Sequence, residues 1–191
     1  ASELQPASVV LTRRLFESLA SGWPDDALLV RFSDSEAAVQ HQLDWVIQSI
    51  DENYKATLLS EHQAGEVWAE VGDFEKQAIR VRLSVPVSAV PAEFEKAYLA
   101  HLDCVVTADI GTGIIRVGFD ADALSAVDQI KRLRASAAGA KGTLTIEKAP
   151  AGVRASADAW GHVGTTAELM RSIKARFDPQ SLLNPGKFGW D

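Results

Sequence analysis

The sequence predicts an α+β protein built on an antiparallel sheet with helices on one face. Three observations favour this class. Apolar stretches typical of strands alternate with stretches of helical periodicity over the first 150 residues. Residues 78–85 alternate strictly between apolar and other side chains, as a half-buried strand does. Gly111-Thr112-Gly113 separates two apolar runs and indicates a tight hairpin.

The first half of the chain is expected to contain two rounds of helix and strand. An amphipathic spacing predicts the opening helix, and Ser33 or Asp34 followed by Glu36 predicts the start of the next one. The expected elements are a helix at 10–20, a strand at 27–32, a helix from about 34 to 50, a strand at 55–59 and a helix at 61–71.

The second half is expected to contain the order β-α-β-β-α-β. Pro91 suits the first turn of a helix, and Asp120 is the expected cap of the next helix, which Gly139 ends. The expected elements are strands at 78–85, 103–110, 113–119 and 142–148, with helices at 91–101 and 120–138. This order is the split βαβ arrangement of ferredoxin-like folds, and the first half looks like a shortened copy of it.

After residue 150 the periodicity weakens and a different kind of segment is expected. Thr165 or Thr166 is placed to cap a helix over 167–177, which Pro179 follows. We therefore expect two parts, a sheet domain over 1–150 and a C-terminal arm over 151–191. Chain ends usually fray, so the turn residues and aromatic rings at the end of this arm predict a surface that binds it.

Composition excludes several classes of function. The net charge is −7, and the basic residues are spread along the sequence, which argues against a nucleic-acid partner. Cys104 is the single cysteine, so no internal disulfide can form, and its apolar surroundings predict a buried side chain. We expect neither a membrane span nor a signal peptide, and hence a cytoplasmic protein.

The arm carries a motif that resembles a known family. Its pairs Trp160-Gly161, Leu169-Met170, Ile173-Lys174 and Asp178-Pro179 precede a Leu-Asn-Pro-Gly-Lys turn at 183–187. This pattern resembles the C-terminal signature of FAD-linked oxidases of the vanillyl-alcohol oxidase type. Within them it is most similar to the FAD-binding subunit of glycolate oxidase. The resemblance covers most of this chain but only the C-terminal half of such a protein.

The resemblance implies a cap domain over a flavin. FAD would be held mainly by a separate N-terminal domain, against which the arm would pack, and the substrate would be a small 2-hydroxy acid. The cap alone would be inactive. Further glycolate oxidase subunits, including an iron–sulfur subunit, are expected partners, through which the protein could associate with a membrane. The residues that would lie beside the cofactor are Trp160, Asn184, Pro185, Gly186 and Lys187.

The chain departs from larger members of the family at the hairpin. Those members carry a G-H-x-G-D-G-N-x-H stretch whose histidines bind a metal, whereas residues 107–116 here read TADIGTGIIR. We therefore expect no metal site. The catalytic residues stay undetermined; the candidates are His162, as a proton acceptor, and Arg116, for a substrate carboxylate, with Arg80 or Arg82 as further arginines. A solvated strand arginine, a surface histidine and a Trp160 that plugs a domain junction are the structural alternatives.

A second class of function stays open. Composition and periodicity fit a non-catalytic ferredoxin-like module that binds a small effector or mediates assembly equally well. The arm motif favours the flavoenzyme, because a free-standing module has no reason to carry the Asp-Pro and Leu-Asn-Pro-Gly-Lys turn.

Overall fold

The protein is described here from a computed structural model of residues 1–191. The structure describes residues 4, 6–15, 26–72, 77–100, 103–161, 164 and 166–186.

Six strands form one antiparallel sheet with the order β2-β1-β4-β5-β3-β6. The described elements are, in chain order, β1 (Ser8–Arg13), β2 (Asp26–Arg31), α1 (Glu36–Ser49), α2 (Glu61–Gly72), β3 (Ile79–Ser84), the 3-10 turn η2 (Val87–Ala89), α3 (Val90–Ala100), β4 (Val105–Asp109), β5 (Ile114–Phe119), α4 (Ala123–Gly139), β6 (Thr143–Lys148), α5 (Ala151–Ala157) and α6 (Thr166–Phe177).

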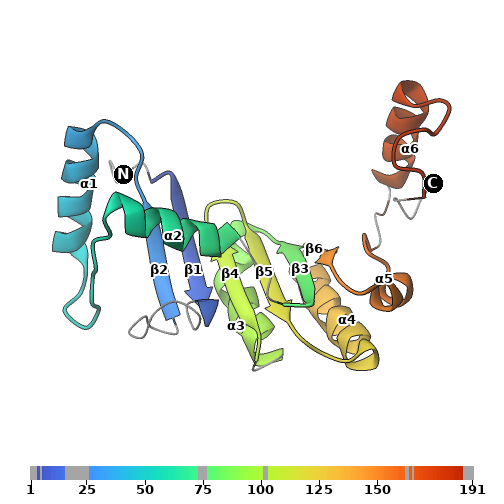
Figure 1. The fold of residues 1–191 in the computed structure, drawn as a ribbon, viewed down its shortest axis with the longest axis horizontal. Helices are drawn as coiled ribbons and strands as arrows, with labels where there is room; N and C mark the ends of the chain where they lie inside the picture. Colours follow the sequence, from blue (N-terminus) through green and yellow to red (C-terminus); the bar gives the residue numbers. More distant parts are fainter. Residues whose placement is uncertain are drawn as a thin grey trace.

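The second half of the chain forms the predicted split βαβ unit. Its strands lie in the order β4-β5-β3-β6, and α3 and α4 cover one face of them (Figure 1). The inward side chains of these strands pack with Phe94 of α3 and Ile130 of α4 into the main core, which also encloses Phe119. The α+β class and the antiparallel sheet are confirmed.

Strands β1 and β2 extend this same sheet beyond β4 instead of forming a separate copy. Val10 and Leu29 lie opposite each other on the two strands and pack with Val67 of α2. On the other face Leu11 lies opposite Ala108 and packs against the main core. Side chains alternate between the faces of a strand, so α2 covers the face opposite α3 and α4, as Figure 1 shows.

Two predictions for the first half were wrong. Residues 8–13 form a strand rather than the start of a helix, because Val10 to Arg13 pair with β2 on one side and β4 on the other. This pairing overrides the helical spacing; residues 16–20 of the expected helix lie outside the described residues. Residues 55–59 form no strand: most of their side chains are exposed, and only Leu59 packs, against the cluster under α2. The order is therefore β-β-α-α.

A single arginine fastens the sheet extension to α3. The Arg13 guanidinium donates hydrogen bonds to Asp26 of β2 and, at 3.0 and 3.1 Å, to Glu95 of α3. It also lies over the rings of Phe94 and Tyr98, with its carbon 5.4 and 4.5 Å from their centroids. These hydrogen bonds raise the pKa of Arg13, so the charge that holds β1, β2 and α3 together is permanent.

Helix caps differ from the predicted ones by one or two residues. Asp122, not Asp120, caps α4 by accepting hydrogen bonds from the backbone N–H groups of Leu124 and Ser125. Asp120 instead accepts one from the Ala78 N–H at 2.7 Å, which ties β5 to the start of β3. Ser35 occupies the cap position of α1 without a side-chain hydrogen bond.

Helix α5 lies at the start of the expected arm, where the periodicity of the sequence weakens. It has only seven residues, too few to show a helical period, and its stability comes from burying Val153 and Ala157 against the core. Arg134 of α4 donates hydrogen bonds to the carbonyl oxygens of Ala157 and Asp158, at 2.7 and 2.6 Å. These contacts close the C-terminal end of α5 where the backbone leaves the helix.

The arm consists of α6 and a turn that is stabilised from within. Asp178 accepts hydrogen bonds from the N–H groups of Leu182 and Leu183, both at 2.9 Å, and from Lys174 Nζ. Lys174 also donates to the Leu183 carbonyl oxygen at 3.0 Å. The expected helix over 167–177 is confirmed, but no described side chain of it is buried. Figure 1 shows the arm projecting beyond α5, away from the sheet.

We predict that Gly113→Ala destabilises the fold by about 2 kcal/mol or more, because a left-handed conformation and a backbone clash combine at this site. Gly113 has a φ of 74°, and a Cβ there would lie 2.1 Å from the Val85 carbonyl oxygen. Denaturant unfolding measures the loss. The matched control is Gly65→Ala in α2, where nothing lies within 4 Å of an added Cβ. That change should be neutral or stabilising, and equal losses in the two variants would contradict the prediction.

We predict that the arm turn keeps its structure at pH values below the ordinary pKa of an aspartate. Hydrogen bonds from Lys174, then from the N–H groups of Leu183 and Leu182, lower the pKa of Asp178. A lowered pKa means that the carboxylate supports the turn above its unfolded pKa, and that this support disappears as the pH falls through the lower folded value. An NMR pH titration of the Leu182 and Leu183 amides measures it.

Two variants complete that experiment. Asp178→Asn should shift both amides at neutral pH, because it removes the charged partner of Lys174. Glu168→Gln removes one charge from the same helix without touching the turn and should leave the amides unchanged. Amides that titrate with the midpoint of an ordinary aspartate, or that ignore Asp178→Asn, would show that the carboxylate does not hold the turn.

Candidate functional site: the arginine face

Cross-strand pairing gathers three arginines on the sheet face opposite α3 and α4. Arg82 of β3 lies directly opposite Arg116 of β5, and Arg80 lies two residues along β3 on the same face. Their neighbours Val81, Leu83 and Val117 point the other way, into the core. We call the surface formed by Arg80, Arg82, Arg116 and Glu147 the arginine face. Three of the 19 basic residues thus lie together although they are separated along the sequence, because pairing brings distant positions together.

Glu147 of β6 is the shared counter-ion of these arginines. Its carboxylate oxygens lie 3.1 Å from Arg80 Nε, 3.9 Å from Arg82 Nε and 3.7 Å from Arg116 Nε. The pairing of β3 with β6 shifts register here, and Glu147 lies between the residues that face Val81 and Arg80. In the described part of the chain, no other carboxylate lies within 4.0 Å of these guanidinium groups.

The four side chains are partly enclosed but not buried. The exposed fraction of the Glu147 side chain is 21%, and the three arginines are somewhat more exposed. The Nε atoms of Arg80 and Arg82 are closed off from solvent, yet neither makes a hydrogen bond within the described structure. A buried donor without an acceptor costs free energy, but these two atoms are closed to an incoming ligand, so a ligand would meet the outer N–H groups of the guanidinium groups.

This arrangement is suited to holding an anion. Three guanidinium groups share one carboxylate, which leaves two positive charges uncompensated within the set. Arg82 and Arg116 are direct cross-strand neighbours, and like charges in that position destabilise a sheet. Guanidinium groups bind carboxylates and phosphates through paired hydrogen bonds, so an incoming oxyanion would relieve the repulsion.

Neutral polar residues border the arginines along the same row of the sheet. Thr107 of β4 lies opposite Arg116, and Thr145 of β6 lies opposite Arg82. Thr12 of β1 follows opposite Thr107, and both of these threonines are buried. The row therefore has a cationic centre with no carboxylate on either side of it.

Sequence reasoning identified Arg116, Arg80 and Arg82 as candidates but missed Glu147. The available signal was the alternation in β6, where Leu144 and Ile146 are buried and Thr145 and Glu147 are less so. Alternation gives the face of a residue but not its neighbour on the next strand. The clustering depends on the pairing of β3 with β5 and β6.

The other predicted site residues lie elsewhere. Trp160 is half-buried just after α5, and its backbone N–H donates to Asp158 Oδ1 at 3.1 Å. The adjacent Ala159 carbonyl oxygen accepts a hydrogen bond from the backbone N–H of Ile146 in β6. Asn184, Pro185 and Gly186 are exposed in the arm turn, and the φ angles of Asn184 and Gly186 are 48° and 66°. The structure does not bring this turn to β5, the strand that carries Arg116 (Figure 1).

Two predicted site residues cannot be placed. His162 and Lys187 lie outside the described residues, as do Phe188 and Trp190. Their proposed roles stay predictions.

Cys104 offers no nucleophile. Its side chain is fully buried in the main core, as predicted, and desolvation raises the pKa of its thiol to about 11. The thiol is therefore protonated at neutral pH. Among the described residues no three His, Cys, Asp or Glu side chains gather into a possible metal site. None of the described helices is long and apolar enough to span a membrane.

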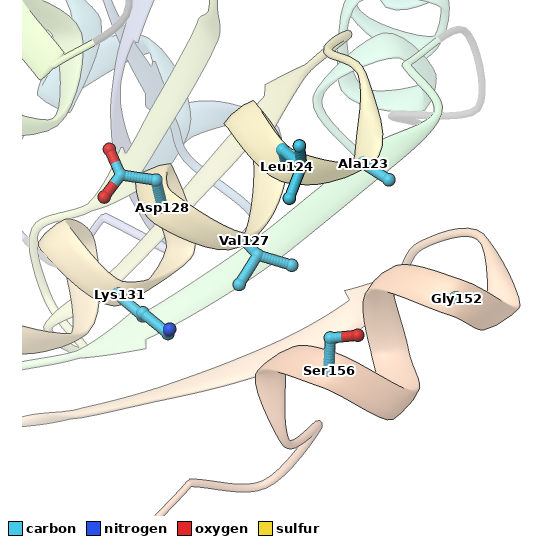
Figure 2. A pocket seen from close by; sticks show the side chains of 7 residues that line it. All are labelled: Ala123, Leu124, Val127, Asp128, Lys131, Gly152 and Ser156. Atoms are coloured by element: carbon cyan, nitrogen blue, oxygen red, sulfur yellow. The ribbon is translucent and has the colours of Figure 1, made fainter.

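A hollow lies on the helix side of the molecule, and the residues that line it offer few groups for binding or catalysis. Figure 2 shows it between α4 and α5. Its volume is about 260 Å³. Leu124 and Val127 supply its apolar wall, and Asp128 and Lys131 are the charged residues that line it. Asp128 already pairs with Arg132 at 2.8 Å. The arginine face is therefore the better candidate for ligand binding.

Comparison with known proteins supports a family assignment. Residues 82–188 match the family described as FAD linked oxidases, C-terminal domain. The match is more than half of the chain and runs from β3 into the end of the arm. A search of curated proteins found no match. The chain therefore belongs to the family of C-terminal domains of FAD-linked oxidases, which supports its assignment as the cap domain of an FAD-dependent oxidoreductase.

Proposed function

We propose that this chain is the cap of an FAD-dependent 2-hydroxy-acid oxidoreductase of the glycolate oxidase type, fastened by its arm to an FAD-binding domain. The observation that carries the proposal is the exposed apolar side of the arm. The family match supports it, because it includes the arm as well as the sheet.

Helix α6 has the properties of a segment that packs against another domain. Its apolar residues Leu169, Ile173 and Phe177 follow at intervals of four and are 62%, 51% and 79% exposed. Residues at this spacing share one helix face. A helix of twelve residues is only marginally stable in water by itself, so the exposed face predicts a surface that covers it.

The arm turn continues that apolar side toward the proposed cofactor site. Leu182 and Leu183 are 71% and 64% exposed, although their N–H groups are held by Asp178. The turn thus presents apolar side chains from a fixed backbone. In this proposal Leu182 and Leu183 join the α6 face in packing against the flavin domain.

The residues of this chain fit a contact with FAD from the cap side. Asn184 and Gly186 have positive φ angles, and nothing lies within 4 Å of a Cβ added at Gly186, so the turn is open to close approach. We propose that Asn184, Pro185, Gly186 and Lys187 line the cofactor, with Trp160 at the domain junction. The described residues contain no glycine-rich loop between a strand and a helix, so the pyrophosphate would be held by the other domain. When bound, FAD supplies the two-electron oxidation.

Arg116 is the proposed contact for the substrate carboxylate, together with its neighbours on the arginine face. His162 is the proposed proton acceptor. We further propose that electrons leave through partner subunits that include an iron–sulfur protein, in the cytoplasm or at a membrane through those partners.

The alternative function is a non-catalytic module that binds an effector or mediates assembly. The arginine face favours it to the extent that an anion could bind there without a flavin. The exposed arm and the family match favour the flavoenzyme.

We predict that a longer chain, with the coding sequence upstream of Ala1 included, binds flavin, whereas residues 1–191 alone do not. Both are purified, and the flavin absorbance and its retention on dilution are measured. Glycolate and D-lactate are then tested for flavin reduction. A colourless longer chain, or the lack of upstream coding sequence for another domain, would contradict the flavoenzyme proposal.

We predict that Leu169→Ser with Ile173→Ser in the longer chain weakens flavin retention by about tenfold or more, because each buried aliphatic side chain contributes about 1.5–3 kcal/mol. The matched control is Glu168→Ser, an exposed position on the same helix that is not part of the apolar face. Equal retention in the double variant and the control would show that α6 does not fasten the domains.

A further inference from the structure

The arginine face has more hydrogen-bond donors than acceptors. Each guanidinium carries five N–H donors, and two carboxylate oxygens of Glu147 face all three groups. Of the residues paired with these arginines, Thr107 and Thr145 are neutral, and Lys148, opposite Arg80, is a further cation. The donors are therefore available to a ligand that brings several oxygens.

Glu147 fixes the arrangement in which these donors are presented. It stands at the register shift of β6, and its carboxylate is the common neighbour of guanidinium groups from β3 and β5. It also cancels one of the three positive charges. With Glu147 in place, a ligand with one negative charge leaves the set cationic, whereas a ligand with two neutralises it.

We propose that the arginine face binds a small dianion, and that Glu147 is the residue that sets this preference for charge. The ligand class is a small molecule with two carboxylates. Glu147 acts as a positioning residue: it spaces the guanidinium groups and is not itself part of any bond-forming step.

This inference narrows the proposed function. Only one part of it rests on the proposed function, namely the identification of the ligand as the substrate. That substrate would be a 2-hydroxy acid with a second acidic group rather than glycolate. The binding itself needs no flavin. Anion binding to residues 1–191 and flavin binding to the longer chain can therefore fail separately.

The experiment is an NMR titration of the isotope-labelled 191-residue chain, with the side-chain Nε–H signals of Arg80, Arg82 and Arg116 as the readout. The probes are malonate and malate as dicarboxylates, and acetate and glycolate as monoanions. Ionic strength is held constant with sodium chloride, because screening would otherwise mimic competition. We expect the dianions to bind about tenfold more tightly than the monoanions, since they interact with twice the charge.

Two variants test the assignment of roles. Arg116→Gln should abolish the preference for dianions, whereas Arg132→Gln, which removes the same charge from an exposed position on α4, should preserve it. Glu147→Gln should strengthen binding of the monoanions by about tenfold, because it leaves a third positive charge uncompensated. Asp128→Asn removes an equivalent charge on α4 and should change nothing.

The result can overturn the proposal at each step. Signals that move for no probe, or that move equally for acetate and malonate, exclude a dianion site. Affinities that are unchanged by Glu147→Gln exclude Glu147 as the residue that sets the preference. None of these side chains is buried, so the variants should fold, and the core methyl signals check this. Arg116→Lys repeats the test with the charge kept and the paired guanidinium donors removed.

Discussion

Strand β3 links the core of this protein to its candidate site, because its two sides serve opposite purposes. Ile79, Val81 and Leu83 are completely buried under α3 and α4, while Arg80 and Arg82 lie on the other face. The strand pairs with β5 on one side and β6 on the other, so its register also fixes Arg116 and Glu147. A slip by one residue would place arginines in the core, and the free energy of apolar burial therefore holds the arginine face in its geometry.

The sheet is larger than a ferredoxin-like unit, and Arg13 shows how the addition is held. Strands β1 and β2 have their own apolar cluster with α2, separate from the main core. Arg13 joins that addition to α3 through the Glu95 carboxylate and two aromatic rings, and it also binds Asp26 of β2. Strands β1 and β2, which extend one edge of the sheet, are thus joined to the central unit by a permanently charged contact as well as by strand pairing.

Much of the fold follows from local sequence patterns, and the misses have identifiable physical causes. The elements from β3 to β6 were predictable because alternation, the Gly111–Gly113 hairpin and helix signals agree along that stretch. The strand at 8–13 was not, because β-branched residues with helical spacing became a strand through pairing with distant partners. Helix α5 was too short to show a period. At the site, the residue types of Arg80, Arg82 and Arg116 indicated anion binding, but Glu147 could be found only from the register of three strands.

The turn held by Asp178 has a consequence for how this cap would join its partner. A flexible tail loses conformational entropy when it binds, and this loss is subtracted from the affinity of the contact. In this arm the backbone of Leu182 and Leu183 is already fixed by hydrogen bonds within the chain. Part of the ordering has thus taken place before any encounter, and the surface that receives the arm needs to supply only apolar contact. The arm is therefore preorganised for binding.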